Sequence, residues 1–173
     1  MVYARRAELA DAAPLAELAE RTFRDAFGDS NTSDDMDLHC RSHYSPEIQA
    51  AEIANPSCTT IVCEQQGELV GFGQICRSEA PSCVAGAAPA EIQRLYVDRR
   101  WHGKGVAQAL MSALIDSATA AHADVVWLGV WENNPRAIAF YAKSGFVQVG
   151  EQEFLLGRDP QRDLVLSRPL HRR

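Results

Sequence analysis

Ile92-Gln-Arg-Leu-Tyr-Val-Asp-Arg-Arg-Trp-His-Gly-Lys-Gly-Val-Ala107 is the stretch of this chain that decides its fold. The pattern over Glu91 to Val97 predicts a strand, and the apolar spacing that begins at Gly105 predicts an amphipathic helix. The loop between them reads Arg100-x-x-Gly103-x-Gly105. Glycine permits positive φ and a close approach to the backbone. We therefore expect a strand, a glycine loop and a helix N-terminus in direct succession.

The loop is typical of a site for phosphate groups. Amides from Arg100 to Ala107 can turn inward on an anion, with the helix N-terminus behind them. A plain strand-to-helix turn is the alternative. A P-loop does not fit, because GxxxxGK followed by Ser or Thr is absent from the sequence. A dinucleotide fingerprint does not fit either, because position 108 is Gln and residues 98–102 separate the strand from the glycines. The basic side chains of the loop are Arg99, Arg100, His102 and Lys104.

A second element follows the apolar strand predicted for residues 125–131. Asn134 predicts the N-cap of a helix and Gly145 its C-terminal end. Ala137 and Tyr141 are four residues apart and share one face of that helix. The small residue lets a ligand approach, and the phenol stands beside it. A core position is the alternative interpretation of Tyr141.

Together the two elements resemble the GNAT superfamily of N-acetyltransferases. The predicted strand, the glycine loop and the Asn134…Tyr141…Gly145-Phe146 segment match in order and spacing. The resemblance covers about residues 59–170, and the first fifty residues match in pattern only. It implies an α/β (α+β) fold with a mixed central sheet of about six or seven strands, flanked by helices, whose splayed central strands bind acetyl-CoA. A loose likeness to bacterial polyamine acetyltransferases is carried by Thr22-Phe23, Asp35-Met36-Asp37-Leu38 and Tyr44-Ser45.

The resemblance also implies roles for particular residues. In the family the pyrophosphate of acetyl-CoA lies on the glycine loop, and the pantetheine arm pairs like an extra strand with the preceding strand. Asn134 and Ala137 would line the arm, and Tyr141 would return a proton to the departing thiolate. The residues implied to bind the cofactor are Leu95, Tyr96, Val97, Arg100, Trp101, His102, Gly103, Lys104, Gly105, Val106, Ala107, Asn134, Ala137 and Tyr141.

The chemistry also needs a base. An amine attacks a thioester as the free base, whereas a Lys-like amine has a pKa of roughly 10. Glu91 resembles the glutamate that several family members use, directly or through water. Alternation places it on the face of Gln93 and Leu95, and an exposed strand-end carboxylate is the alternative. A main-chain amide within residues 95–97 would bind the oxyanion.

The acceptor expected from this resemblance is the primary amine of a small molecule, with direct transfer and no metal. An acidic run suggests a cationic, polyamine-like acceptor over the N-terminal helices, although such a run is usually a solvated face. A non-catalytic acetyl-CoA sensor and a protein or peptide N-acetyltransferase are the alternatives. His39 and His43 have the i, i+4 spacing of metal ligands, but no third ligand is evident. The acidic residues are Asp25, Asp29, Asp34, Asp35 and Asp37.

Composition limits the remaining possibilities. The 173 residues fit one domain spanning 1–173, and a net charge of −6 argues against a nucleic-acid platform. The charged N-terminus and the lack of a long apolar run predict neither signal peptide nor membrane span. Five cysteines without a CxxC pair predict reduced thiols in the cytoplasm. A homodimer is left open.

The remaining patterns predict the order β-α-α-β-β-β-α-β-α-β-β, in which the two shorter helical pieces 34–44 and 46–54 count as one α. Residues 79–90 are rich in Ala, Pro, Ser and Gly and predict a mobile loop. The predicted strands are 2–6, 59–64, 69–76, 91–97, 125–131, 146–151 and 163–167, and the predicted helices are 11–27, 34–44, 46–54, 105–121 and 134–144.

Overall fold

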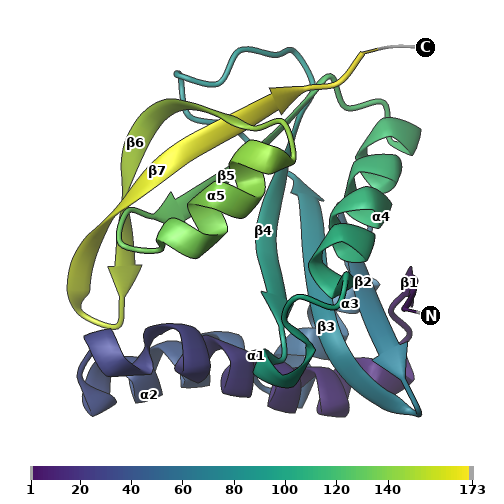
Figure 1. Ribbon diagram of the computed structural model, residues 1–173, viewed down its shortest axis with the longest axis vertical. Helices are drawn as coiled ribbons and strands as arrows, with labels where there is room; N and C mark the ends of the chain where they lie inside the picture. Colours follow the sequence, from purple (N-terminus) through teal and green to yellow (C-terminus); the bar gives the residue numbers. More distant parts are fainter. Residues whose placement is uncertain (1, 172–173) are drawn as a thin grey trace.

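The computed structural model describes residues 2–171, which form one seven-stranded mixed sheet with helices on both faces (Figure 1). The strand order is β1-β2-β3-β4-β5-β7-β6, which confirms the predicted sheet. The strands are β1 Tyr3–Arg6, β2 Cys58–Gln65, β3 Glu68–Arg77, β4 Pro89–Val97, β5 Val125–Trp131, β6 Val147–Leu156 and β7 Asp159–Pro169. The helices are α1 Ala12–Phe27, α2 Ser33–His43, α3 Pro46–Ala54, α4 Val106–Ala120 and α5 Pro135–Lys143, with short 3-10 turns at Leu9–Asp11, Gly28–Ser30 and Arg99–Trp101.

The apolar stripes of the helices divide the core between the two faces. α4 buries Val106, Leu110 and Leu114 against one face, where α5 adds Tyr141. α1 buries Leu15 and other apolar residues against the opposite face, together with residues of α2. Amphipathic helices need such a partner surface, because their apolar stripe is stable only out of water. The two shorter helices are separate elements, so three helices lie between β1 and β2.

The segment predicted as a mobile loop is instead fastened to the sheet. β4 begins at Pro89, and the irregular part before it is tied down at several points. Val84 is buried against Val125 and Trp127. The amides of residues 87 and 88 donate to the carboxylate of Asp124 over 2.7 and 3.0 Å. Small, polar composition marked the absence of regular structure but could not reveal these tethers.

One pair of cysteines differs from the predicted reduced state. Cys58 and Cys76 lie directly opposite each other on β2 and β3 and form a disulfide. Cys40, Cys63 and Cys83 are free thiols. The pair is 18 residues apart in sequence, so only the register of the hairpin brings it together.

The central strands β4 and β5 diverge. They are parallel, and in the described part of the chain their pairing ends at Glu91 opposite Trp127. β4 also carries a bulge, because Arg94 pairs with Gln74 while Ile92 pairs with Ile75. Beyond Glu91 the two strands therefore separate into a V, which is visible in the middle of the sheet (Figure 1). Among residues 2–171, none of the helices combines the length and apolar character that crossing a bilayer requires.

Candidate active site

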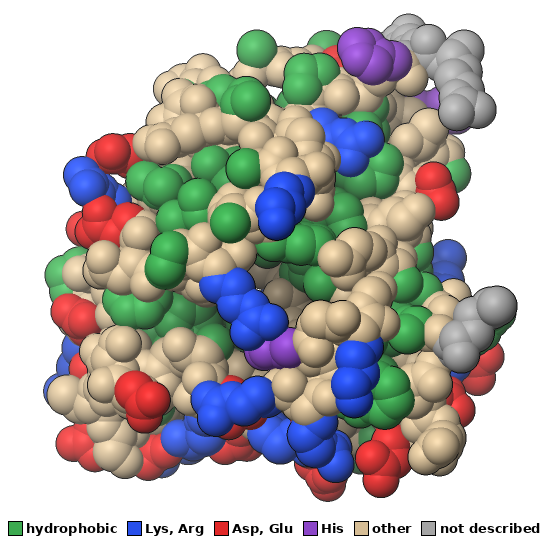
Figure 2. Space-filling view, in the orientation of Figure 1, with side chains coloured by type: hydrophobic (Ala, Val, Ile, Leu, Met, Phe, Trp, Pro, Cys, Tyr) green, Lys and Arg blue, Asp and Glu red, His purple; other side chains and the backbone are tan. Residues whose placement is uncertain are grey.

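The divergence of β4 and β5 opens a cleft of about 760 Å³ through the sheet. Its lining extends from Gly103 and Gly105 after β4, past Tyr141 of α5, to Phe27 of α1 and Phe154 of β6. Figure 2 shows a hollow in the middle of one face, with basic side chains beside it. We call the end at the glycines the loop half of the cleft, and the end lined by α1, β6 and β7 the acceptor half.

The loop half is built for an anion. Gly103 and Gly105 have φ of 74° and 84°, and a Cβ at either position would meet no atom within 4 Å. Gly105 is the N-cap of α4 and has no side chain that could bond the first amides of the helix. Those amides, at the positive end of the helix dipole, are therefore available to a ligand. The predicted succession of strand, glycine loop and helix is confirmed.

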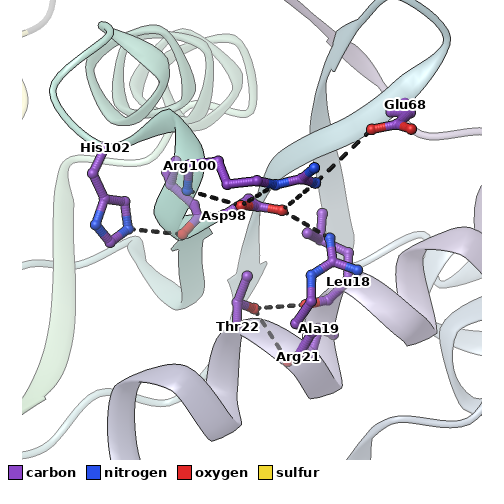
Figure 3. Close-up of polar contacts among 9 residues, drawn as sticks. Leu18, Ala19, Arg21, Thr22, Glu68, Asp98, Arg100 and His102 are labelled. Carbon is purple, nitrogen blue, oxygen red and sulfur yellow. Dashed lines mark hydrogen bonds and ion pairs between the residues drawn. The ribbon is translucent and has the colours of Figure 1, made fainter.

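A buried carboxylate shapes the loop (Figure 3). Asp98, 4% exposed, accepts from the Arg100 amide at 2.9 Å, and from the Arg100 and Arg21 guanidinium groups at 3.0 Å each. Hydrogen bonds from Arg100 hold the pKa of Asp98 far below its ordinary value, and Arg21 adds to the effect. Arg100 is thus turned toward Asp98, and the Lys104 ammonium lies 4.8 Å from the centre of the Trp101 ring. Their roles in cofactor binding stay predictions.

His102 and Arg136 connect the two sides of the loop half. Arg136, at the start of α5, donates to His102 Nδ1 at 2.8 Å. The other ring nitrogen of His102, Nε2, therefore carries the hydrogen and donates to the Val97 carbonyl at 2.9 Å. Arg99, His102 and Arg136 line the cleft. Arg136 carries no signal of its own in the sequence, because its neighbour Pro135 indicates only a helix start.

The residues predicted on α5 come together on the cleft. The Asn134 side chain caps the helix by accepting from the Ala137 amide at 3.2 Å. Asn134, Ala137 and Tyr141 line the cleft, with Tyr141 only 9% exposed. Burial raises the pKa of the Tyr141 phenol well above its ordinary value, so this hydroxyl is protonated at neutral pH and can donate a proton. Its catalytic role stays a prediction.

Glu91 lies at the vertex of the V, and its carboxylate accepts from Ser78 Oγ at 3.0 Å. The predicted face holds for Gln93, whose Nε2 donates to the Glu91 carboxylate at 3.5 Å. It is wrong for Leu95, because the bulge at Gln93 interrupts the alternation. Leu95 packs into the α4 core. On β3, Cys76 pairs with Glu91 and Gln74 pairs with Arg94. Cys76 and Gln74 are two residues apart and so share a face. Glu91 therefore lies on the same face of β4 as Arg94. Glu91 nevertheless lines the cleft.

The acceptor half has aromatic walls. The Phe27 ring lies 5.6 Å from that of Trp131, and the Phe23 ring lies 6.2 Å from that of Tyr96. Phe154 lines the same space. Trp131 lies half-buried at the cleft.

The predicted acidic run does not line this half as a group. Asp37 pairs with Arg24 at 2.8 Å, and Asp35 accepts from Thr32 and from the Arg158 amide. Asp29 and Asp35 border a separate depression. Asp25 is the member of the run that lines the cleft. Helical rotation and local pairing thus turn most members of the run away from the cleft, and binding of the acceptor against the run stays a prediction.

A different carboxylate, not predicted from the sequence, lies in the acceptor half. Asp163 of β7 is 7% exposed, and burial raises its pKa to about 6. Its sequence context gave no signal, because a single Asp at a predicted strand start is ordinary. Only the pairing of β7 with β5 brings it to the cleft.

The two histidines of α2 form an aromatic stack. His39 lies 4.1 Å from the Phe23 ring and 4.1 Å from the His43 ring. Burial lowers the pKa of His39 to about 4, so the ring is neutral at physiological pH. Within residues 2–171, no group of three or more His, Cys, Asp or Glu side chains is arranged to hold a metal ion.

Comparison with known proteins gives a consistent result. The model of the acetyltransferase (GNAT) family matches residues 15–146. An uncharacterised N-acetyltransferase of Mycobacterium tuberculosis is 31% identical over 162 residues, covering 94% of this chain and 99% of that protein. The spermine/spermidine N(1)-acetyltransferase of Bacillus subtilis is 24% identical over 136 residues, covering 75% of this chain and 90% of that protein. The crystal structure of a PaiA N-acetyltransferase from Thermoplasma acidophilum in complex with coenzyme A aligns with a TM-score of 0.79 at 18% identity. The alignment covers 98% of this chain and 99% of that chain.

Proposed function

Because the chain belongs to the GNAT acetyltransferase family and is an acetyl-CoA-dependent N-acetyltransferase, we propose that it acetylates the primary amine of a small molecule. The observation that carries the proposal is a single cleft with an anion site at one end and an aromatic pocket at the other. A ligand that fills the loop half brings its reactive end to the acceptor half. We treat residues 1–173 as one domain, since one sheet includes strands from both ends of the chain.

The acceptor half favours a small molecule over an extended peptide. The β6–β7 hairpin reaches the α2 region, where the Arg158 amide donates to Asp35 and Gln161 donates to Asn31 at 2.6 Å. These contacts close one side of the acceptor half, as the position of the hairpin over α2 indicates (Figure 1). A peptide acceptor would need an open groove there.

Acetyl-CoA fits the loop half. We infer that amides of Gly103–Ala107 bind the pyrophosphate, with Arg99, His102 and Arg136 adding positive charge. The main chain of Leu95–Val97 would pair with the pantetheine arm, because β4 has no strand neighbour on its β5 side there. Bound acetyl-CoA supplies the activated acyl group as a thioester.

Proton transfers complete the proposed reaction. Tyr141 lines the cleft in protonated form and would give its proton to the departing thiolate. Glu91 would take the proton of the amine, directly or through a water at the vertex. A main-chain amide within residues 95–97 would bind the oxyanion.

The test is an amine panel assayed with acetyl-CoA by free-thiol release, with products identified by mass spectrometry. We expect acetylation of primary amines and poor turnover of peptides. Acetyl-CoA binding without transfer to any member of either class would favour a sensor. Transfer to peptides alone would overturn the proposed acceptor class.

A further inference from the structure

Resting on the function proposed above, the geometry points to Asp163, assisted by Gln152, as the residue that binds the ammonium group of the acceptor. A primary amine with a pKa near 10 reaches the enzyme mainly as a cation at neutral pH. Some group in the acceptor half must therefore recognise a positive charge. The acidic run at residues 25–37 is largely engaged elsewhere, whereas Asp163 is not.

The sheet register places Asp163 beside the cleft. It lies opposite Trp131 on β5 and opposite Gln152 on β6. Asp163 Oδ1 is fully buried and has no hydrogen-bond partner among residues 2–171. Buried carboxylate oxygens are normally satisfied by donors. A ligand that carries N–H groups would supply the missing donors.

Gly129 lets the side chains of Asp163 and Gln152 lie against the backbone of β5. A Cβ built on this β5 residue would lie 2.9 Å from Asp163 Oδ2 and 2.7 Å from Gln152 Nε2. The two polar ends therefore converge over one glycine, at the point where any other residue would place a side chain. Both side chains also line the cleft. The Gln152 amide can present its oxygen after a flip, so an ammonium in the cleft beside them meets two acceptors.

Aromatic rings complete the subsite. Trp131 and Phe154 line the cleft beside Asp163, and Tyr96 faces it from β4. Ring faces attract a cation and also pack against an apolar body. The acceptor class that fits is a primary ammonium on an apolar or aromatic carrier.

Among the charged side chains of residues 2–171, none forms an ion pair with Asp163. Tyr96 is close enough for the Asp163 charge to raise its pKa slightly beyond the effect of burial. Arg94 is held by Glu52. The other carboxylates lining the cleft are Asp25 of α1 and Glu91 of β4. Burial raises the pKa of Asp163 to about 6, so at neutral pH it is an anion.

The test uses the full-length protein saturated with CoA, which cannot transfer an acyl group. Dissociation constants of 2-phenylethylamine and of the neutral 2-phenylethanol are measured by calorimetry at about pH 7.5. We expect the amine to bind roughly 10-fold or more tightly than the alcohol, as a charge-assisted hydrogen bond allows. In Asp163→Asn the preference should disappear. Asp116→Asn, which removes an exposed carboxylate of α4, should keep it.

Other outcomes separate the subsite from the proposed function. Failure of the wild-type protein to prefer the amine, or an unchanged preference in Asp163→Asn, would overturn the assignment. Unaltered CoA affinity in the variant shows that it is folded. Lack of CoA binding by the wild type would instead count against the proposed function. At about pH 5 the wild-type preference should shrink, because Asp163 takes up a proton while the amine stays charged.

Discussion

Removing the charge of Asp163 should stabilise the ligand-free protein. Burial raises the pKa of this carboxyl from an ordinary 3.8 to about 6, and two pKa units correspond to about 3 kcal/mol. Water in the cleft screens part of this free-energy cost, which leaves a destabilisation of about 1–2 kcal/mol. Because the folded pKa exceeds the unfolded one, the folded state holds the proton more tightly. Its stability therefore falls as pH rises from about 4 to 6 and remains lower above that range.

Urea denaturation of the wild type, Asp163→Asn and Asp116→Asn at about pH 7.5 and pH 4 measures this effect. At neutral pH the Asp163→Asn protein should exceed the wild type by about 1–2 kcal/mol in free energy of unfolding. At about pH 4 the difference should nearly vanish, because the wild-type carboxyl is then protonated. A variant that is no more stable than the wild type at neutral pH would refute the reasoning. The expected gain in stability with a loss of amine preference is typical of functional sites.

Three further predictions concern the loop, the proton transfers and the disulfide. Gly105→Val should weaken acetyl-CoA binding sharply, because a side chain at φ of 84° is strained and obstructs the phosphates. The control Gly28→Ala, at an ordinary φ of −59°, should not weaken binding. Equal affinities of the two variants by calorimetry would contradict the loop assignment. Glu91→Gln should lower kcat by about 10²–10⁴-fold at neutral pH, and its kcat should recover partly as pH rises. Tyr141→Phe should lower kcat less, with little change in acetyl-CoA affinity. The pH–rate profiles of both variants measure these effects, and a wild-type profile for Glu91→Gln would show that Glu91 is not the base. The double variant Cys58→Ser, Cys76→Ser should lose about 2–4 kcal/mol in free energy of unfolding, measured by denaturation. Its folded fraction should still transfer acetyl groups, because direct transfer needs no acyl-enzyme. An acetyl-cysteine adduct found by mass spectrometry would refute direct transfer.

Local patterns predicted the elements that local chemistry determines. Val125–Trp131 is a strand with the predicted bounds, because its apolar run ends in turn residues. The glycine loop was recognisable because its glycines, its basic residues and the helix start adjoin in sequence. The helix cap at Asn134 was likewise readable, since a cap depends on a few neighbouring residues.

Features that depend on strand pairing had no comparable signal. Gln152 and Asp163 meet Gly129 only because β6 and β7 pair in one particular register. The bulge at Gln93 places Leu95 on the opposite face from Glu91, although the sequence around it alternates normally. The disulfide likewise had no local signal, because Cys58 and Cys76 meet only through the register of the β2–β3 hairpin.

The early end of the pairing between β4 and β5 has a consequence for the free protein. Most sheets expose unpaired strand edges at their two margins, whereas this sheet also has two edges in its interior. A pantetheine chain lying between them would act as a removable strand, so the cofactor-bound sheet would be continuous from β1 to β6. Hydrogen exchange at the amides of Leu95 and Val97 should therefore slow when CoA is added. The concentration of CoA would then influence how well these inner edges are shielded from aggregation.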